Sequence, residues 1–176
     1  MKNTVIFFSA LLLFCGCKKN IDELPEATQT GANTFGTKIN GNNWGPLGGS
    51  FLTAPTLEAR VGADSSLFIN ARNFSREPTE TEMEIYLQHV SAPGTYALNR
   101  STEVYPSQSA SYGYYVKREV SVQDEWMTNT TTTGSVQVSK IDWPAHIISG
   151  TFSFKAAARY GSAPIDVTEG RFDVKF

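Results

Sequence analysis

Both cysteines of this chain lie near its N-terminus, and thiols are the side chains here with the most distinctive chemistry. Cys15 and Cys17 fall in the stretch FCGCKKNIDELPE, directly after an apolar run. A metal or redox site needs further ligands or a folded surround that tunes the thiolate, and the chain has no third cysteine. A disulfide across one intervening residue would be strained. The pair is therefore better explained by processing of the N-terminus.

The apolar run VIFFSALLLF, residues 5–14, has the features of a secretory signal. Lys2 supplies the positive start and Gly16 a small residue at the cleavage point, whereas a membrane-spanning helix needs about 20 apolar residues. A small residue followed by cysteine resembles a bacterial lipoprotein signal, in which that cysteine is lipidated and becomes the first residue. We expect lipid on Cys17, and we expect Cys15, which follows a bulky side chain, to leave with the signal.

The composition divides the chain into three expected segments. These are a signal peptide over residues 1–16, a flexible tether over 17–33 that begins with the lipidated cysteine, and one all-β domain over 34–176. A chain of 176 residues, 40% of them hydrophobic, has enough apolar material for one core. The stretch KKNIDELPEATQTGAN lacks apolar periodicity and is rich in polar residues. As a coil it would hold the domain about 20–25 Å from the lipid.

From Thr34 onward, apolar side chains recur with a period of two, which is typical of half-buried strands. In TEMEIYLQHV, for example, Met83, Ile85 and Leu87 share one face of such a strand. About nine or ten segments of this kind are joined by short turns. The pattern predicts an all-β fold, either an antiparallel β-sandwich or a flattened β-barrel.

Turns and breaks in the period can be placed on individual residues. Asn40-Gly41 predicts a tight hairpin turn, because both residue types tolerate positive φ, and residues 62–65, GADS, predict a second hairpin. The apolar positions change phase near Glu169-Gly170, which predicts a glycine bulge or a tight corner. A similar change predicts a kink around residues 139–140.

Several blocks of the sequence resemble those of a known family. The blocks are TFGTKINGNNW, APGTYALN, VSKID, IISGTFSFKA and VTEGRFDVKF. They are similar to a family of small secreted lipoproteins from Bacteroidota that is defined only as a domain of unknown function. The resemblance implies a membrane-anchored, all-β protein and brings no known substrate, cofactor or catalytic residue.

Charge and metal-ligand types limit the function classes. A net charge of −2 without a basic cluster makes nucleic acid an unexpected partner. The two histidines, His89 and His146, lie in different segments, so we expect no metal site and no cofactor. Glu80, Glu82 and Glu84, preceded by Glu77, could offer oxygen ligands to Ca²⁺. The preferred interpretation is the charged outer face of an edge strand.

Two aspartates are candidates for acid and base chemistry. Asp142 in KIDW and Asp173 in GRFDVKF could form the carboxylate pair that glycoside cleavage requires. Nothing in the sequence brings them together, and Asp173 alternates with Phe172 and Val174 as a solvent-facing residue would. We therefore assign no catalytic residue and expect a protein that is not an enzyme.

Aromatic side chains are the remaining candidates for ligand binding. Tyr115, Tyr105 and Trp126 could form a patch of flat rings that stack on sugars or another small ligand. Tyr112 and Tyr114 share a face with Val116, as core residues do, so Tyr115 is expected to be the ring that points outward.

The expected function is a lipid-anchored, outer-membrane-associated β-domain that acts as a non-enzymatic binding or structural accessory module. It would lie in the cell envelope, facing the periplasm or the cell surface, with the membrane, a glycan or another envelope protein as partner. One alternative is a carbohydrate- or small-ligand-binding lipoprotein with an aromatic surface. Another is a hydrolase with an unrecognised carboxylate pair.

The lipid anchor can be tested by mass spectrometry of the protein purified from membranes. We expect the N-terminal peptide to begin at Cys17 and to carry the mass of acyl chains. An unlipidated peptide that begins before Cys17 would contradict the assignment.

Overall fold

The computed structural model describes residues 20–49, 54–76, 79–102, 108–119 and 121–176, and this part of the chain forms strands and turns without a helix. The prediction of an all-β fold is confirmed. Eleven strands are present in the described residues, one more than the upper estimate, because the short segment after Asn40-Gly41 is a strand of its own. The strands are β1 (Thr34–Ile39), β2 (Asn42–Trp44), β3 (Leu57–Val61), β4 (Leu67–Arg76), β5 (Thr79–Leu87), β6 (Gly94–Leu98), β7 (Tyr112–Arg118), β8 (Val122–Met127), β9 (Gly134–Asp142), β10 (Ile147–Ala158) and β11 (Ile165–Lys175).

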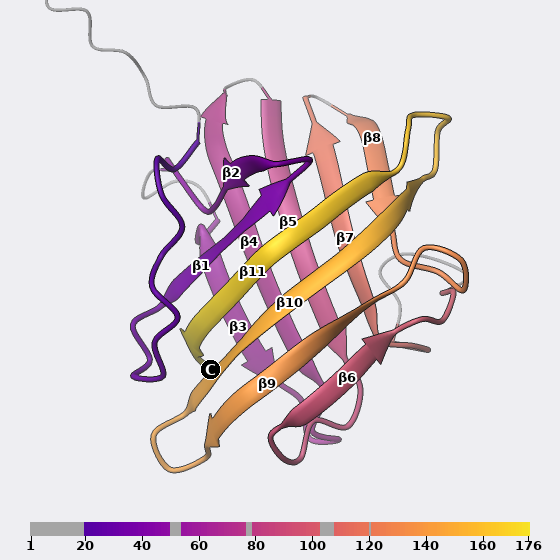
Figure 1. Ribbon diagram of the computed structural model, residues 1–176. Helices are drawn as coiled ribbons and strands as arrows, with labels where there is room; N and C mark the ends of the chain where they lie inside the picture. The colour runs from indigo at the N-terminus through magenta and orange to yellow at the C-terminus, as the bar shows by residue number, and fades with distance from the viewer. Residues whose placement is uncertain (1–19, 50–53, 77–78, 103–107, 120) are drawn as a thin grey trace, which may run out of the picture.

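The strands form one antiparallel sheet that folds over into two facing layers (Figure 1). The front layer has the order β6-β9-β10-β11-β1-β2, and the back layer has the order β8-β7-β5-β4-β3. The two layers are continuous because the end of β10 leaves its front-layer partners and pairs with β8 through Ala157 and Ala158. A parallel bridge between Leu47 and Asn73 joins the layers a second time. The result lies between a sandwich and a flattened barrel.

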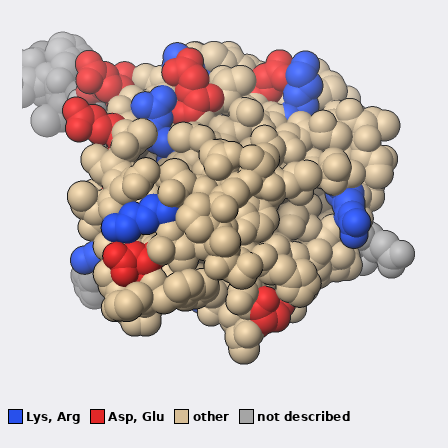
Figure 2. Space-filling view, turned by 60° about the horizontal axis from the view of Figure 1, so that its bottom comes forward, with Lys and Arg blue, Asp and Glu red and all other residues tan. Residues whose placement is uncertain are grey.

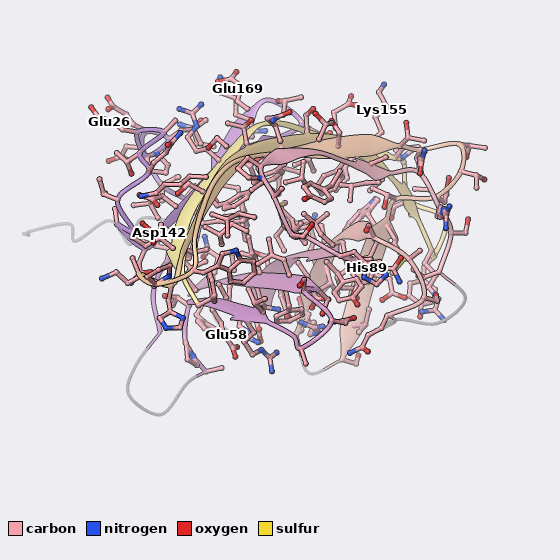
Figure 3. All side chains as sticks on the ribbon, turned by 90° about the horizontal axis from the view of Figure 1, so that it is seen from below. Glu26, Glu58, His89, Asp142, Lys155 and Glu169 are labelled. Atoms are coloured by element: carbon pink, nitrogen blue, oxygen red, sulfur yellow. The ribbon has the colours of Figure 1, made fainter. Side chains whose placement is uncertain are left out.

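The apolar faces of the two layers pack against each other and form the main core. Met83, Ile85 and Leu87 of β5 are fully buried there, as their shared face predicts. Figure 3 shows the two layers in cross-section, with side chains filling the space between them. Glu169 and Lys155 point outward from the front layer and Glu58 from the back layer. Burial of this apolar surface is the main favourable contribution to folding.

The predicted turns are confirmed. Asn40 and Gly41 have φ values of 49° and 81°, as the turn between β1 and β2 requires. Residues 62–65 connect β3 and β4, which pair in register as a hairpin. Both turns follow from local chemistry, so the sequence was sufficient to place them.

The two predicted breaks are confirmed as bulges. Phe152 of β10 pairs with Gly170, and Phe154 pairs with Val167, so β11 holds one extra residue at this point. Glu169 takes the positive φ of 52°. On β9, Ser139 is the extra residue, because Ser149 and Gly150 of β10 pair with positions 140 and 138. Each bulge moves the apolar positions back to the core face.

One face of the molecule carries few charged side chains. On the face shown in Figure 2, Lys, Arg, Asp and Glu are scattered near the edges and the middle is uncharged. This face therefore offers no concentration of positive charge to hold phosphates. Within the described residues, no helix has the length and apolar character needed to cross a membrane.

Replacing Gly170 by Ala should destabilise the fold by about 1–3 kcal/mol, because a Cβ atom there would lie 2.4 Å from ring atoms of Phe152. Gly94→Ala is the matched control, since nothing lies within 4 Å of a Cβ atom at that strand position. Urea unfolding at equilibrium measures both changes. Equal effects of the two substitutions would show that the close packing under the bulge is not needed.

Candidate functional site

The candidate site is a cleft of about 530 Å³ at one end of the molecule, between the two layers. Its walls come from segments far apart in the sequence: the β1–β2 hairpin, the start of β5, the β7–β8 hairpin and residues 162–165 beside the β10–β11 turn. In Figure 1 these turns lie at the upper end of the layers. Asn20, the first described residue, also lines the cleft.

Three aromatic rings form the floor of the cleft. Trp44, Tyr115 and Trp126 come from β2, β7 and β8, and their ring centroids are 5.9 Å apart for Trp44 and Tyr115 and 5.6 Å apart for Tyr115 and Trp126. The indole N–H of Trp44 donates to Thr81 Oγ1 at 3.0 Å, and that of Trp126 donates to the backbone oxygen of Ala163 at 2.9 Å. The rings are therefore held in place before any ligand binds.

Amide side chains form the rim. Asn43 is half-buried and donates to the backbone oxygen of Asp22 at 2.6 Å, while Asn73 is buried below the rim and donates to that of Gly45 at 2.9 Å. Asn42 is exposed at the lip. Each asparagine carries both donors and acceptors, so the rim can bind a polar ligand that has no net charge.

The charges at the cleft are balanced. Among the described lining residues, Lys117 is the one cation and Asp124 the one carboxylate, and they face each other across β7 and β8. The ammonium of Lys117 lies 5.4 Å from the centre of the Trp126 ring. This electrostatic balance also favours a neutral polar ligand.

The structure brings together two of the three aromatic residues singled out from the sequence. Tyr115 and Trp126 are direct cross-strand partners, and Tyr105 lies outside the described residues. Trp44 was missed, although the Asn40-Gly41 turn places it on a strand that returns along β1. Only a long-range contact reveals that this strand faces Tyr115.

The prediction that Tyr115 points outward is wrong, because its ring lies in the main core and is 5% exposed. Tyr112, Tyr114 and Val116 are buried on the opposite face of β7, where they form a second cluster with Tyr86. Strand alternation correctly separates the two sets of residues. Alternation does not show, however, that side chains on both faces of the back layer are buried.

Glu82 and Glu84 of the acidic run on β5 are buried and Glu80 is half-buried, so the interpretation of the run as the charged face of an edge strand is wrong. β5 lies between β4 and β7 in the back layer. Glu82 forms ion pairs with Arg118 and Arg72, and Glu84 accepts hydrogen bonds from Tyr112 and Asn70. These partners offset the cost of burying the carboxylates. Glu77 lies outside the described residues.

Asn70 connects the two glutamates of β5. Its amide nitrogen donates to both Glu82 and Glu84, which fixes the orientation of the side chain and leaves its carbonyl oxygen without a hydrogen-bond partner among the described residues. These contacts tie β4 to β5 on the outer side of the back layer. We therefore interpret the carboxylates as structural.

A third buried carboxylate extends this network to β8. Glu125 accepts a hydrogen bond from the hydroxyl of Tyr114 at 2.6 Å and pairs with Arg159 at 2.5 Å. Burial and the contact with Glu125 raise the pKa of Tyr114 well above its ordinary value. The hydrogen bond to Glu125 also raises the pKa of Arg159. Tyr114 is thus a neutral hydrogen-bond donor at any physiological pH.

Asp173 is buried, so its assignment to a solvent-facing position is wrong. Its carboxylate accepts hydrogen bonds from the backbone N–H groups of Thr30, Gly31 and Ala32 at 2.8–3.1 Å. The hydroxyls of Thr28 and Ser149 donate at 2.6 and 2.7 Å, and that of Thr30 donates at 3.4 Å. Its oxygens are committed to these donors, which gives Asp173 a structural role.

These hydrogen bonds govern the ionisation of Asp173. Burial by itself would raise its pKa, but the donors of Thr28, Ser149, Ala32 and Gly31 outweigh burial and hold the pKa well below its ordinary value. The carboxylate is therefore charged at neutral pH. It fastens the segment before β1 to β11.

Residues 20–33 belong to the folded domain, which corrects the expectation of a free tether over this stretch. Besides the contacts of Asp173, Lys140 donates to the backbone oxygen of Gln29 at 3.0 Å and Arg171 to that of Pro25 at 3.3 Å. Ile21 packs closely on Gly45: a Cβ atom added at Gly45 would lie 2.9 Å from the Cδ1 methyl carbon of Ile21. Cys17 lies outside the described residues.

Potential metal ligands do not gather in the described part of the chain, where no group of three or more His, Cys, Asp or Glu side chains could hold an ion. His89 and His146 are exposed and occupy separate turns with positive φ. These histidines thus act as turn residues.

The fold and the cleft define a two-layer, all-β domain with an aromatic floor at one end. The chain belongs to the family described as Domain of unknown function (DUF6252), which matches residues 45–174. Searches of curated proteins and of solved structures found no match. Membership confirms the resemblance to a domain of unknown function, while the Bacteroidota lineage and the lipoprotein nature stay predictions. The matched region begins after Trp44, so the segment bound by Asp173 precedes it.

Replacing Asp173 by Asn should lower the free energy of unfolding by about 2–4 kcal/mol, because an amide N–H₂ would face buried donors. The control Asp166→Asn changes an exposed carboxylate on the same strand and should have an effect within about 0.5 kcal/mol. Chemical denaturation of both variants and the native chain measures these differences.

The same variant gives a prediction for pH. Because folding lowers the pKa of Asp173, its contribution to stability is complete above the ordinary value of 3.8 and is lost as pH falls through the lowered value. The stability difference between the native chain and Asp173→Asn should therefore shrink below pH 3.8. A difference that stays constant or grows on acidification would contradict this account.

Proposed function

We propose that this protein is a lipid-anchored, non-enzymatic binding module of the cell envelope, and that its cleft binds a neutral glycan. The observation that carries the proposal is the convergence of Trp44, Tyr115 and Trp126 beneath a rim of asparagine side chains. Trp44 lies more than 70 positions before Tyr115, whereas Tyr115 and Trp126 lie on the two strands of one hairpin. We interpret the meeting of the three rings at one cleft as support for ligand binding there.

The chemistry of the cleft matches that of a sugar. One face of a sugar ring presents C–H groups that pack on aromatic rings, and its hydroxyls both donate and accept hydrogen bonds. Trp44, Tyr115 and Trp126 line the floor with small exposed parts of their rings, each residue being 4–5% exposed, and Asn42 offers an exposed amide. Apolar lining with a few placed polar groups is the usual composition of small-ligand sites.

The anchor and the location belong to the same proposal. The apolar run, Gly16 and Cys17 support export and lipidation, and the resemblance to secreted lipoproteins supports the outer membrane as destination. The domain would face the periplasm or the cell surface. Another envelope protein is the alternative partner.

Binding can be tested with the Cys17→Ser chain on a glycan array, followed by titration calorimetry of each hit. Asn42→Ala should weaken binding by about 2- to 10-fold, because one neutral hydrogen bond is lost at the lip. The matched control is Asn99→Ala, since Asn99 is exposed beyond β6 and away from the cleft.

Thermal unfolding should be unchanged by both asparagine substitutions, because both side chains are exposed. Absence of any glycan hit would contradict the proposal. Equal loss of binding in Asn42→Ala and Asn99→Ala would contradict the assignment of the cleft.

A further inference from the structure

The described chain begins at the lip of the cleft, and its first residues are fixed there. Asn20 lines the cleft, and the backbone oxygen of Asp22 accepts the hydrogen bond from Asn43 on the rim. Ile21 is packed against Gly45. In Figure 1 the N-terminal indigo segment starts at the same end as the β1–β2 and β10–β11 turns. The contacts of Ile21 and Asp22 therefore fix the start of the described chain at the lip of the cleft.

The distance from this point to the lipid is short. Asn20 lies three positions after Cys17, and three residue steps span at most about 11 Å whatever path the chain takes. The headgroup region on one side of a bilayer is itself about 5–8 Å thick. An anchor at Cys17 thus keeps the lip of the cleft beside the lipid headgroups, well inside the 20–25 Å that a free tether over 17–33 would allow.

The opposite end of the molecule then points away from the membrane. It carries the β9–β10 turn with Trp143 and His146, which lies at the lower end of the layers in Figure 1. A large glycan free in solution would have to enter the narrow space between domain and bilayer to reach the cleft. A sugar carried by a lipid of the same membrane is already there.

The charges of the cleft limit the chemical class of headgroup that it can bind. Phosphate headgroups are bound by clusters of arginine and lysine, whereas Lys117 in this cleft is offset by Asp124. Asn42 and Asn43 instead provide neutral donors and acceptors. The rim is therefore suited to hydroxyl groups.

We propose that the cleft faces the membrane that holds the anchor and binds the sugar headgroup of a glycolipid in that membrane. This inference rests on the proposed function, from which it takes the lipid anchor and the glycan-binding cleft. It adds that the sugar is attached to a lipid of the same membrane. Attachment to the membrane raises the effective concentration of cleft and ligand for each other. The protein would thus act at the membrane surface and leave glycans in bulk solution largely unbound.

Orientation can be measured on the full lipidated chain in phosphatidylcholine vesicles that contain a nickel-chelating lipid. A spin label on Asn42→Cys, at the lip, should be relaxed strongly by the headgroup nickel, while one on Ala145→Cys, in the exposed β9–β10 turn, should not. The same labels on the Cys17→Ser chain should behave alike. Stronger relaxation at Ala145→Cys than at Asn42→Cys would overturn the inference.

The ligand's carrier can be tested with a neutral glycolipid, digalactosyldiacylglycerol, in phosphatidylcholine vesicles and with the free digalactose disaccharide in solution. The anchored chain should bind the vesicle-borne form at least about 10-fold more tightly than the free form, and Asn42→Ala should reduce that binding. Equal affinity for both forms, or binding of neither, would overturn the inference.

The failures of the two proposals can be told apart. Finding Cys17 without lipid would contradict the proposed anchor. Finding that the Cys17→Ser chain binds no glycan would contradict the proposed function. A lipidated chain that binds free glycans with its cleft turned away from the bilayer would leave the proposed function standing. Only the inference about the ligand's carrier would then fall.

Discussion

The hydrogen bonds that converge on Asp173 are the constraint on which the rest of the arrangement depends. A carboxylate buried in a sheet must have its lone pairs satisfied, and here the backbone of residues 30–32 supplies three donors and the hydroxyls of Thr28, Thr30 and Ser149 supply three more. Because β11 lies in the middle of the front layer, this contact holds the N-terminal segment against the most central part of that layer. The path of residues 28–32 follows from it, whereas the residues next to Asn20 are held by the contacts of Ile21 and Asp22.

The back layer is stabilised on both of its faces, by different physics. Its inner face contributes apolar side chains to the main core, while its outer face buries tyrosines and the carboxylates of Glu82, Glu84 and Glu125 with arginine and asparagine partners. Removing one member of such a network costs more than the network contributes as a whole. The network therefore gives the back layer a specific register. The cleft is built from the end of this layer and takes its rigidity from it.

Sequence reasoning succeeded where the deciding interactions are local. Asn40-Gly41 forms a turn because of its own backbone preferences, and the slip at Glu169-Gly170 is visible because apolar side chains must return to one face. It failed for Asp173 and for Glu82, because alternation shows which residues share a face but not what covers that face. Tyr115 was assigned to the wrong side for the same reason.

The sequence by itself determined the all-β class, the hairpin turns, the bulges and the apolar N-terminal run with its cysteine, since each depends on neighbouring residues or on a period of two. Tertiary structure alone decided that Trp44 joins Tyr115 and Trp126 in one cleft, and that residues 20–33 are held against the rest of the domain. Trp44 and Tyr115 are in contact although they lie more than 70 positions apart in the sequence. Thr30 and Asp173 are hydrogen-bonded although they lie more than 140 positions apart. Strand pairing over such separations has no local signal, because it is set by how the two layers fold over each other.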